Sequence, residues 1–186
     1  MLPIFSGVVK RLDAQSVQDF WMLHSDAGCG NCFCVAWWVP TWVGWEKRSA
    51  EENRSFRQEL FARGEYDGYL LYHADVPIGW CQVGPRDRLV KIVKTFDLSP
   101  DPKVQAITCF FLKKDWRSQG IGTWFLSQVL QDLRSQGVRR VEGFPSTESS
   151  HDSGEIWTGT KGMFQKAGFQ SHSKYPDGRV MLWQEI

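Results

Sequence analysis

The sequence predicts an α/β (α+β) fold, because segments with strand and helix patterns alternate along its C-terminal two thirds. The apolar run at 106–112 is typical of a strand, and 121–133 carries apolar side chains at helical spacing. Residues 138–144 have the pattern of another strand, and a hairpin is expected within 69–83. This order predicts a central sheet flanked by helices.

The N-terminal third predicts two helices separated by an irregular segment. A first strand is expected at 7–11 and a helix at 14–23. Residues 28–45 are irregular and very aromatic. A polar helix is expected at 49–61, with Ser49 as its cap and a stop at Gly64.

The remaining elements are predicted from turn residues and apolar spacing. The hairpin strands are 69–72 and 78–83, joined by a turn-rich connection at 73–77. Residues 84–103 predict a long loop with a short strand at 89–93. Gly137 stands where a helix C-cap glycine would end the helix at 121–133, and 180–183 predict a closing strand.

Composition indicates one enzyme-sized domain spanning 1–186. The net charge is +1, so no overall field favours nucleic acid or anionic membranes. No apolar run reaches the roughly eighteen residues of a spanning helix, and the N-terminal residues do not resemble a secretion signal. Five cysteines, an odd number, argue against a secreted disulfide framework. We therefore expect a cytoplasmic protein that binds neither nucleic acid nor membranes.

Residues 117–123, with the sequence RSQGIGT, lie between the predicted strand at 106–112 and the following helix. Backbone N–H groups converge at such a helix N-terminus, and the helix dipole adds positive potential. Gly120 and Gly122 let the backbone approach a ligand closely. The P-loop pattern and the three-glycine dinucleotide fingerprint are both absent. A phosphate-binding turn and an ordinary tight turn both remain compatible with this pattern.

The [RQ]-x-x-G-x-[GA] pattern of this segment resembles the coenzyme A diphosphate loop of the GNAT superfamily of N-acetyltransferases. A short segment ending at Gly168 and Phe169 resembles another GNAT signature, in which a helix ends at Gly-Phe. The segments at 79–81, 142–145 and 157–160 are similar to a bacterial GNAT branch of unassigned substrate. The resemblance is clearest over 70–169.

The resemblance implies a mixed, largely antiparallel sheet whose middle strands splay to admit acetyl-CoA. It implies that 1–64 forms the acceptor side and 65–186 the acyl-CoA-binding core. The splayed strand would offer free backbone groups to the pantetheine amides, Arg117 would help neutralise the diphosphate, and Thr123 could add a donor. The implied cofactor-binding residues are Phe111, Leu112, Lys113, Arg117, Ser118, Gln119, Gly120, Ile121, Gly122, Thr123 and Phe164.

The implied chemistry is direct attack of a neutral amine on the thioester within a ternary complex. A base must remove a proton from the ammonium form of the acceptor. Glu142 is the first candidate, because its strand is expected beside the cofactor-binding strand, although a structural role is also compatible with its position. His24 and Cys109 are further candidates, each with a structural or core alternative.

Two residues depart from the family pattern. Phe164 stands where many members place a Tyr that serves as general acid, and Phe cannot donate a proton. Trp157 stands where many have an Asn. These departures leave open a second function, a catalytically weak acyl-CoA-binding regulatory module.

Other features leave several interpretations open. Cys29, Cys32 and Cys34 could bind a metal, pack in the core or act in redox chemistry, and we expect no metal site. The tryptophans of 37–45 could pack as a lid or form an acceptor-pocket wall. The acceptor is expected to be an amine of a small molecule or peptide, and exposed aromatic side chains are compatible with a homodimer.

Overall fold

The computed structural model of the chain describes residues 5–25, 31–145, 157–175 and 180–186. No helix in these segments is both long and apolar enough to cross a membrane. The elements are, in order, β1 (Val8–Arg11), α1 (Val17–His24), the 3-10 helix η1 (Trp45–Lys47), α2 (Ala50–Ala62), β2 (Tyr69–His73), β3 (Val76–Pro85), the 3-10 helix η2 (Arg86–Arg88), α3 (Val90–Thr95), β4 (Val104–Leu112), the 3-10 helix η3 (Lys114–Trp116), α4 (Ile121–Ser135), β5 (Arg140–Gly143), α5 (Lys161–Lys166), β6 (Gln170–Lys174) and β7 (Val180–Glu185).

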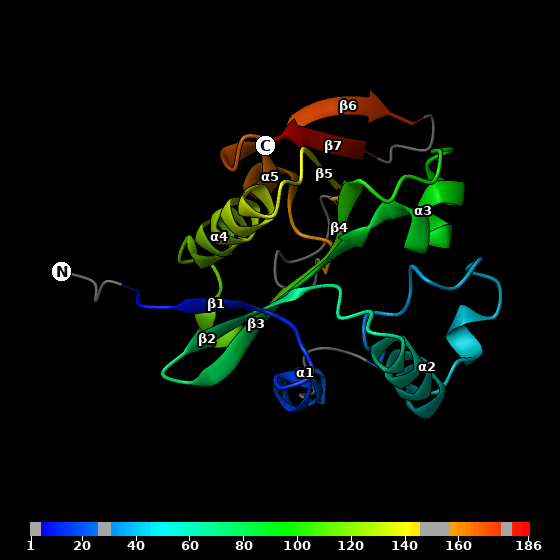
Figure 1. The fold of residues 1–186 in the computed structure, drawn as a ribbon, viewed down its shortest axis with the longest axis horizontal. Coiled ribbons are helices and arrows are strands. Elements are labelled where there is room, and N and C mark those ends of the chain that lie inside the picture. Colours follow the sequence, from blue (N-terminus) through cyan, green and yellow to red (C-terminus); the bar gives the residue numbers. More distant parts are fainter. Residues whose placement is uncertain (1–4, 26–30, 146–156, 176–179) are drawn as a thin grey trace.

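One seven-stranded sheet crosses the molecule in the order β1-β2-β3-β4-β5-β7-β6 (Figure 1). Every neighbouring pair is antiparallel except β4 and β5, which are parallel. The parallel pair needs a crossover connection, and α4 supplies it. The mixed, largely antiparallel sheet expected from the sequence is confirmed.

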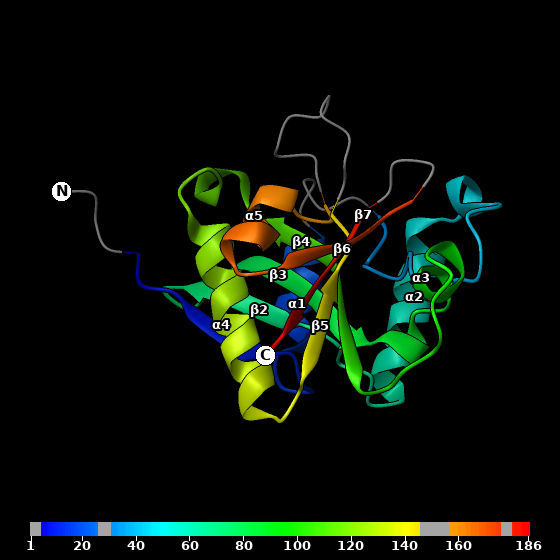
Figure 2. The ribbon, with the colours of Figure 1, turned by 90° about the horizontal axis from the view of Figure 1, so that it is seen from above.

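Helices cover both faces of this sheet, with α4 and α5 on one face and α1 and α2 on the other (Figure 1 and Figure 2). The apolar stripe of α4 packs on the first face, where Phe125, Leu126 and Val129 have no exposed surface. This packing holds α4 along its length, so the core determines the direction in which the N-terminus of α4 points.

The predicted helix starts and stops are confirmed where local chemistry decides them. Ser49 accepts a hydrogen bond from the backbone N–H of Glu52, and the Glu52 carboxylate accepts one from the Ser49 N–H, which completes a capping box at the start of α2. Gly64 and Gly137 follow α2 and α4 with φ of 77° and 80°. These left-handed conformations are the ones that glycine adopts without strain.

The strand predicted at 89–93 is wrong, because the chain forms α3 there. A short run rich in Val and Ile also suits a strand, but Leu89, Ile92 and Phe96 are buried together at helical spacing. The connection predicted at 73–77 is also too long. Ala74 and Asp75 form a tight turn with φ of 46° and 62°, so β3 begins at Val76. β6 was not predicted.

We expect Ser49→Ala to lower the free energy of unfolding by about 1 kcal/mol, because one amide at the start of α2 loses its capping oxygen. Urea denaturation would measure the change. Ser55→Ala, an exposed position on the same helix, is the matched control and should change stability by less than about 0.5 kcal/mol. Equal effects of the two substitutions would contradict the capping role.

Candidate active site

The sheet opens between β4 and β5. The two strands pair only where 104–107 faces 140–143, yet β4 continues to Leu112 while β5 ends at Gly143. Residues 108–112 therefore have no partner in β5. This is the splay expected from the sequence, and we call the diverging ends of β4 and β5, which lie beside the turn that leads into α4, the wedge.

The turn between β4 and α4 presents a series of backbone amides. Among the described residues, the N–H groups of 118–120 find no backbone acceptor. Residues 121–123 supply the first N–H groups of α4, which have no acceptor inside the helix, and the first helical bond runs from Trp124 N to Gly120 O at 3.1 Å. Free amides and the positive end of a fifteen-residue helix thus coincide at this turn.

Gly120 shapes this turn through its conformation. Its φ is 79°, in the left-handed region, and a Cβ placed there would meet no atom within 4 Å. The space over the turn is therefore open to a ligand. Gly122 differs, since its Cβ would lie 3.4 Å from Met163 Sδ on α5. Of the two glycines, Gly120 borders open space and Gly122 faces protein.

The residues expected beside the turn lie at the end of β4. Nε of Arg117 donates to the carbonyl of Leu112 at 2.7 Å, and its guanidinium lies 5.6 Å from the Phe111 ring centre. The backbone N–H of Lys113 donates to the carbonyl of Ile78. Arg117 is thus folded back against β4, where its charge sits next to the open amides.

Some backbone groups of the splayed part of β4 are already bonded to protein. The N–H of Phe110 donates to the carbonyl of Trp157 at 2.7 Å, and the Leu112 carbonyl accepts from Arg117. The free backbone groups expected on the splayed strand are therefore not found at these two positions. A segment far along the chain substitutes here for the missing neighbouring strand.

Phe164 fills the point where β5 ends. Its ring is fully buried, and a Cβ on Gly143 would lie only 2.5 Å from Phe164 Cε1. The Phe169 ring packs on it at 5.0 Å, and Gly168 has φ of 98°. The predicted Gly-Phe helix ending is confirmed. The observed contacts of Phe164 are packing contacts.

Glu142 is fully buried on β5, immediately before the splay. Its Oε1 accepts from Nη1 of Arg86 at 2.7 Å and from Nε of Arg140 at 3.2 Å. Its Oε2 has no hydrogen-bond partner among the described residues. The two guanidinium groups favour a structural role for this carboxylate, while Oε2 remains available to another donor.

His24 and Cys109 lie together on the opposite side of the sheet from α4. Nδ1 of His24 donates to the carbonyl of Phe20, because that oxygen can only accept, and Nε2 lies 3.4 Å from Cys34 Sγ. Cys34 Sγ is in turn 3.4 Å from Cys109 Sγ. Burial lowers the pKa of His24 from 6.5 to about 3, so its imidazole is neutral. These contacts favour structural roles.

The predicted three-cysteine cluster is only partly visible, since Cys29 lies outside the described residues. Within them, no group of three His, Cys, Asp or Glu side chains is placed to hold a metal ion. Burial and hydrogen bonding raise the pKa of Cys32 and Cys34 well above the usual thiol range.

Three tryptophans gather next to the splayed part of β4. Nε1 of Trp37 donates to the carbonyl of Thr108 at 3.2 Å, and its ring lies 5.3 Å from Trp42 and 5.9 Å from Trp157. Trp42 and Trp157 remain 41% and 45% exposed. Nζ of Lys91 lies 3.3 Å from the Trp42 ring centre, and burial lowers its pKa to about 8. We call Trp37, Trp42 and Trp157 the aromatic wall.

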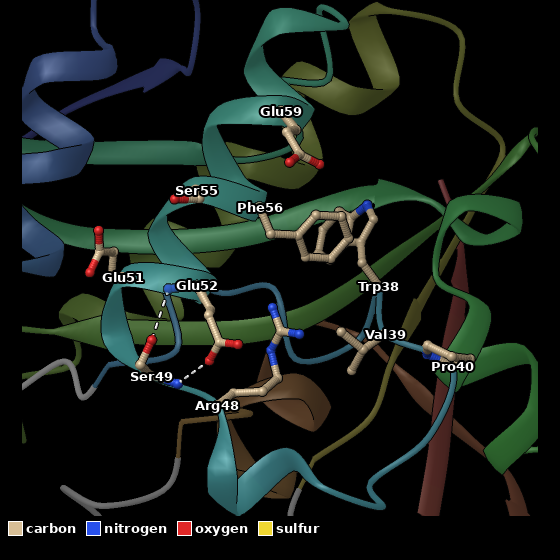
Figure 3. Close-up of a pocket in the computed structure, with 10 residues that line it drawn as sticks. All are labelled: Trp38, Val39, Pro40, Arg48, Ser49, Glu51, Glu52, Ser55, Phe56 and Glu59. Carbon is tan, nitrogen blue, oxygen red and sulfur yellow. Dashed lines mark hydrogen bonds between the residues drawn. The ribbon is translucent and has the colours of Figure 1, made fainter.

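A groove of about 620 Å³ lies between α2 and the segment at 38–40 (Figure 3). The rings of Trp38 and Phe56 form its apolar part, and carboxylates project from α2. Glu52 is occupied by its capping bond, whereas Glu51 and Glu59 form no ion pair within the described residues. The guanidinium of Arg48 also lines the groove, which therefore combines apolar surface with charges of both signs.

The sequence alone did not identify several functional residues of this region. Arg86 and Arg57 become notable only through burial beside Glu142 and beside aromatic rings. The role of the Trp157 carbonyl could not be predicted, because it depends on which segment reaches the open edge of β4. Lys91 lies between two apolar residues in the sequence, and this pattern does not predict that its ammonium group lies over the Trp42 ring.

The turn of free amides at the N-terminus of α4, beside the open end of the β4–β5 pair, is suited to bind a phosphate group. The model of the acetyltransferase (GNAT) family matches residues 32–169. The chain therefore belongs to this acetyltransferase family, and the family predicted from the sequence is confirmed. The comparison with curated proteins finds no match.

Several solved structures have a similar fold. Aminoglycoside acetyltransferase AAC(6')-Ib in complex with coenzyme A and kanamycin has a TM-score of 0.60 and 16% identity over 97% of this chain and 95% of that chain. A GNAT-family acetyltransferase from Desulfovibrio desulfuricans has a TM-score of 0.59 and 14% identity, over 97% and 99%. A ribosomal-protein-alanine N-acetyltransferase from Brucella melitensis has 0.54 and 11%, over 96% and 99%. At these identities the likeness establishes the fold.

We expect Glu142→Gln to lower the free energy of unfolding by roughly 3 kcal/mol, because Arg86 would lose its buried counter-ion. Urea denaturation at pH 7 would measure this. Glu185→Gln is the matched control, since the Glu185 carboxylate also faces Arg140, at 3.9 Å, but is 60% exposed. It should cost less than about 0.5 kcal/mol. Similar losses for the two variants would argue against a buried ion pair at Glu142.

Stability should depend on pH through His24. The unfolded chain protonates this imidazole near pH 6.5, and the folded chain only near pH 3, so below pH 6.5 protons favour the unfolded state. The stabilisation that comes from the neutral His24 is fully present above pH 6.5. Below that pH, the free energy of unfolding should fall by about 1.4 kcal/mol per pH unit toward pH 3. Urea denaturation at pH 7 and pH 5 should show this fall in the wild type and in His73→Gln, but much less of it in His24→Gln. An unchanged pH dependence in His24→Gln would show that His24 is not buried and neutral.

Proposed function

We propose that this protein transfers the acetyl group of acetyl-CoA to an amine of a small molecule or peptide. The observation that carries the proposal is the row of unpaired amides at 118–123, which borders open space at the N-terminus of α4. Such a group of donors suits the diphosphate of coenzyme A. Membership of the acetyltransferase family supports the same reaction and favours an enzyme over the regulatory module.

We assign the acyl donor to residues 65–186. The amides of Ser118, Gln119, Gly120, Ile121, Gly122 and Thr123 would bind the diphosphate, with Arg117 supplying positive charge. The pantetheine arm would enter the wedge beside 111–113. The Phe164 ring, which packs against Gly143, would support the thioester end of the pantetheine arm. Because Phe110 N is bonded to Trp157, the pantetheine amides would rely on other groups or displace that contact.

We assign the acceptor to the opposite side, formed mainly by 1–64. The aromatic wall contacts the Thr108 carbonyl on the splayed strand through the buried Trp37, and its other two rings, Trp42 and Trp157, are partly exposed. Ring faces bind alkyl groups, other rings and cations. The groove on α2 carries the carboxylates of Glu51 and Glu59, which could pair with an ammonium group of the acceptor, and it also carries the guanidinium of Arg48. The complex of AAC(6')-Ib with kanamycin is compatible with an amine acceptor on this fold.

The transfer itself requires positioning and proton removal. The amine nitrogen would attack the thioester carbon directly, and coenzyme A would leave as a thiolate. Glu142 Oε2 is the carboxylate oxygen without a partner among the described residues, so Glu142 stays the first candidate for the base, acting through water. His24 and Cys109 are weaker candidates. The His24 ring contacts the Phe20 carbonyl and Cys34 Sγ, and Cys109 Sγ contacts Cys34 Sγ. Phe164 cannot serve as the acid.

We further propose a cytoplasmic location, in keeping with the odd number of cysteines. The sequence-based predictions of a single domain, of a homodimer and of no binding to nucleic acid or membranes stay predictions. Sedimentation analysis would test the dimer.

The reaction is tested by following free thiol release from acetyl-CoA in the presence of a panel of monoamines, diamines and peptide amines. We expect amine-dependent release and a product heavier by one acetyl group. Tight binding of coenzyme A without release for any amine would instead support the regulatory module.

We expect Gly120→Trp to weaken coenzyme A binding at least 100-fold, because the indole would occupy the open space over the amides. Gly137→Trp is the matched control: its φ is also left-handed, its Cβ would also meet nothing within 4 Å, and it lies at the far end of α4. Both variants carry the same backbone penalty of about 1–2 kcal/mol. Calorimetry should show normal affinity for Gly137→Trp only. Equal affinities in the two variants would rule out the diphosphate site.

A further inference from the structure

Two cysteines from distant parts of the chain meet on the α1 side of the sheet. Cys34 belongs to the segment after α1 and Cys109 to the splayed part of β4, and their Sγ atoms are 3.4 Å apart. Both side chains are buried. A disulfide has an S–S distance of about 2.0 Å, so the two sulfurs would need to approach by roughly 1.4 Å. We call this pair the thiol pair.

The backbone on both sides of Cys34 is held in place. Nδ2 of Asn53 donates to the carbonyl of Asn31 at 2.9 Å, and Trp37 donates to the carbonyl of Thr108, next to Cys109. Phe33 and Cys34 have φ of 42° and 53°, a conformation that non-glycine residues rarely adopt. The surrounding contacts therefore maintain a strained turn that directs Cys34 toward β4.

A buried cation interacts electrostatically with the thiol pair. Arg57 is fully buried among aromatic rings, and none of its three side-chain nitrogens has a hydrogen-bond partner among the described residues. A buried cation without a counter-ion is costly, and it stabilises a nearby negative charge. The hydrogen bond with Cys109 and burial raise the pKa of Cys34, and the charge of Arg57 opposes that rise without cancelling it. The lone pair on Nε2 of His24 faces Cys34 Sγ at 3.4 Å and can accept a hydrogen bond from a thiol.

We propose that Cys34 and Cys109 form an oxidative modification site, at which hydrogen peroxide converts the two thiols into an intramolecular disulfide. The Cys34 thiolate attacks one peroxide oxygen, which breaks the O–O bond, forms a sulfenic acid and releases hydroxide that takes up a proton. The Cys109 sulfur then attacks the sulfenic sulfur and displaces water. In total two thiols and one peroxide give one disulfide and two waters.

The other cysteines are less suited to this reaction. Cys81 is fully buried in the core beneath α4, on the other face of the sheet from the thiol pair. Cys32 is two residues from Cys34 in the same strained turn, and its sulfur is 3.4 Å from the backbone nitrogen of Cys34. Among the described cysteines, which do not include Cys29, the pair that joins separate elements is therefore Cys34 with Cys109.

The disulfide would connect the segment that carries Trp37 to β4. It would restrain the aromatic wall, whereas the amides at 118–123 lie beyond the end of β4 and would be untouched. The cross-link itself does not rest on the proposed acetyl transfer. Its effect on activity does: coenzyme A affinity should stay within twofold of the reduced protein, while turnover of the amine falls at least fivefold.

The cross-link is tested by exposing the folded, full-length protein to hydrogen peroxide, then alkylating it after unfolding. We expect alkylated thiols to drop from five to three, with peptide mapping that joins the peptide containing Cys34 to the one containing Cys109. Dithiothreitol should restore all five thiols. Five alkylated thiols after oxidation, or a disulfide that joins any other pair, would overturn the proposal.

Matched variants separate the thiol pair from the remaining cysteines. Cys34→Ser and Cys109→Ser should each abolish the cross-link, while Cys81→Ala should retain it. Arg57→Met keeps the volume and removes the charge, and it should slow cross-linking at least tenfold if the cation supports the thiolate. Peptide mapping of the wild type decides the question even if a variant does not fold, and it is read without reference to enzyme activity.

Discussion

The short parallel pairing of β4 with β5 is the constraint on which the rest of this structure depends. Four residue pairs hold the strands together, and β5 then ends at Gly143 while β4 continues. The ring of Phe164 occupies the place that a side chain at 143 would need. Because the strands cannot pair further, backbone groups of β4 face a wedge, and the turn into α4 lies at its edge.

Electrostatics reinforces this arrangement on two sides. At the turn, α4 contributes a helix N-terminus and open amides, and Arg117 adds charge from the end of β4. Beneath the splay, Glu142 is held by Arg86 and Arg140. The pair between Arg86 and Glu142 connects the residue that follows β3 to β5, so the buried carboxylate helps to hold these two segments together whatever its part in proton transfer.

The α1 side of the sheet differs in character. Aromatic rings, a neutral imidazole, buried thiols and an unpaired guanidinium occupy it. These groups lie beneath the segment that carries the aromatic wall, so the chemistry of the buried layer and the position of the wall are mechanically connected through Trp37 and Thr108.

The sequence by itself determined the elements whose signals are local. The capping box at Ser49, the left-handed glycines at 64, 137 and 168, and the apolar stripe of α4 depend on residues within one or two turns of each other. The turn at 117–123 could be recognised for the same reason, since its glycines and its flanking strand and helix are adjacent in the chain. Family membership followed from these motifs.

Only the tertiary structure decided the environment of single side chains. The run at 89–93 suits a strand or a helix, and packing beside Phe96 selected the helix. Whether Glu142 faced solvent, acceptor or arginine depended on Arg86, fifty-six residues away. The contacts of Cys34 with Cys109 and of Phe110 with Trp157 likewise join residues far apart in sequence. Burial and pairing are properties of the folded chain, and no local pattern encodes which distant group will supply the partner.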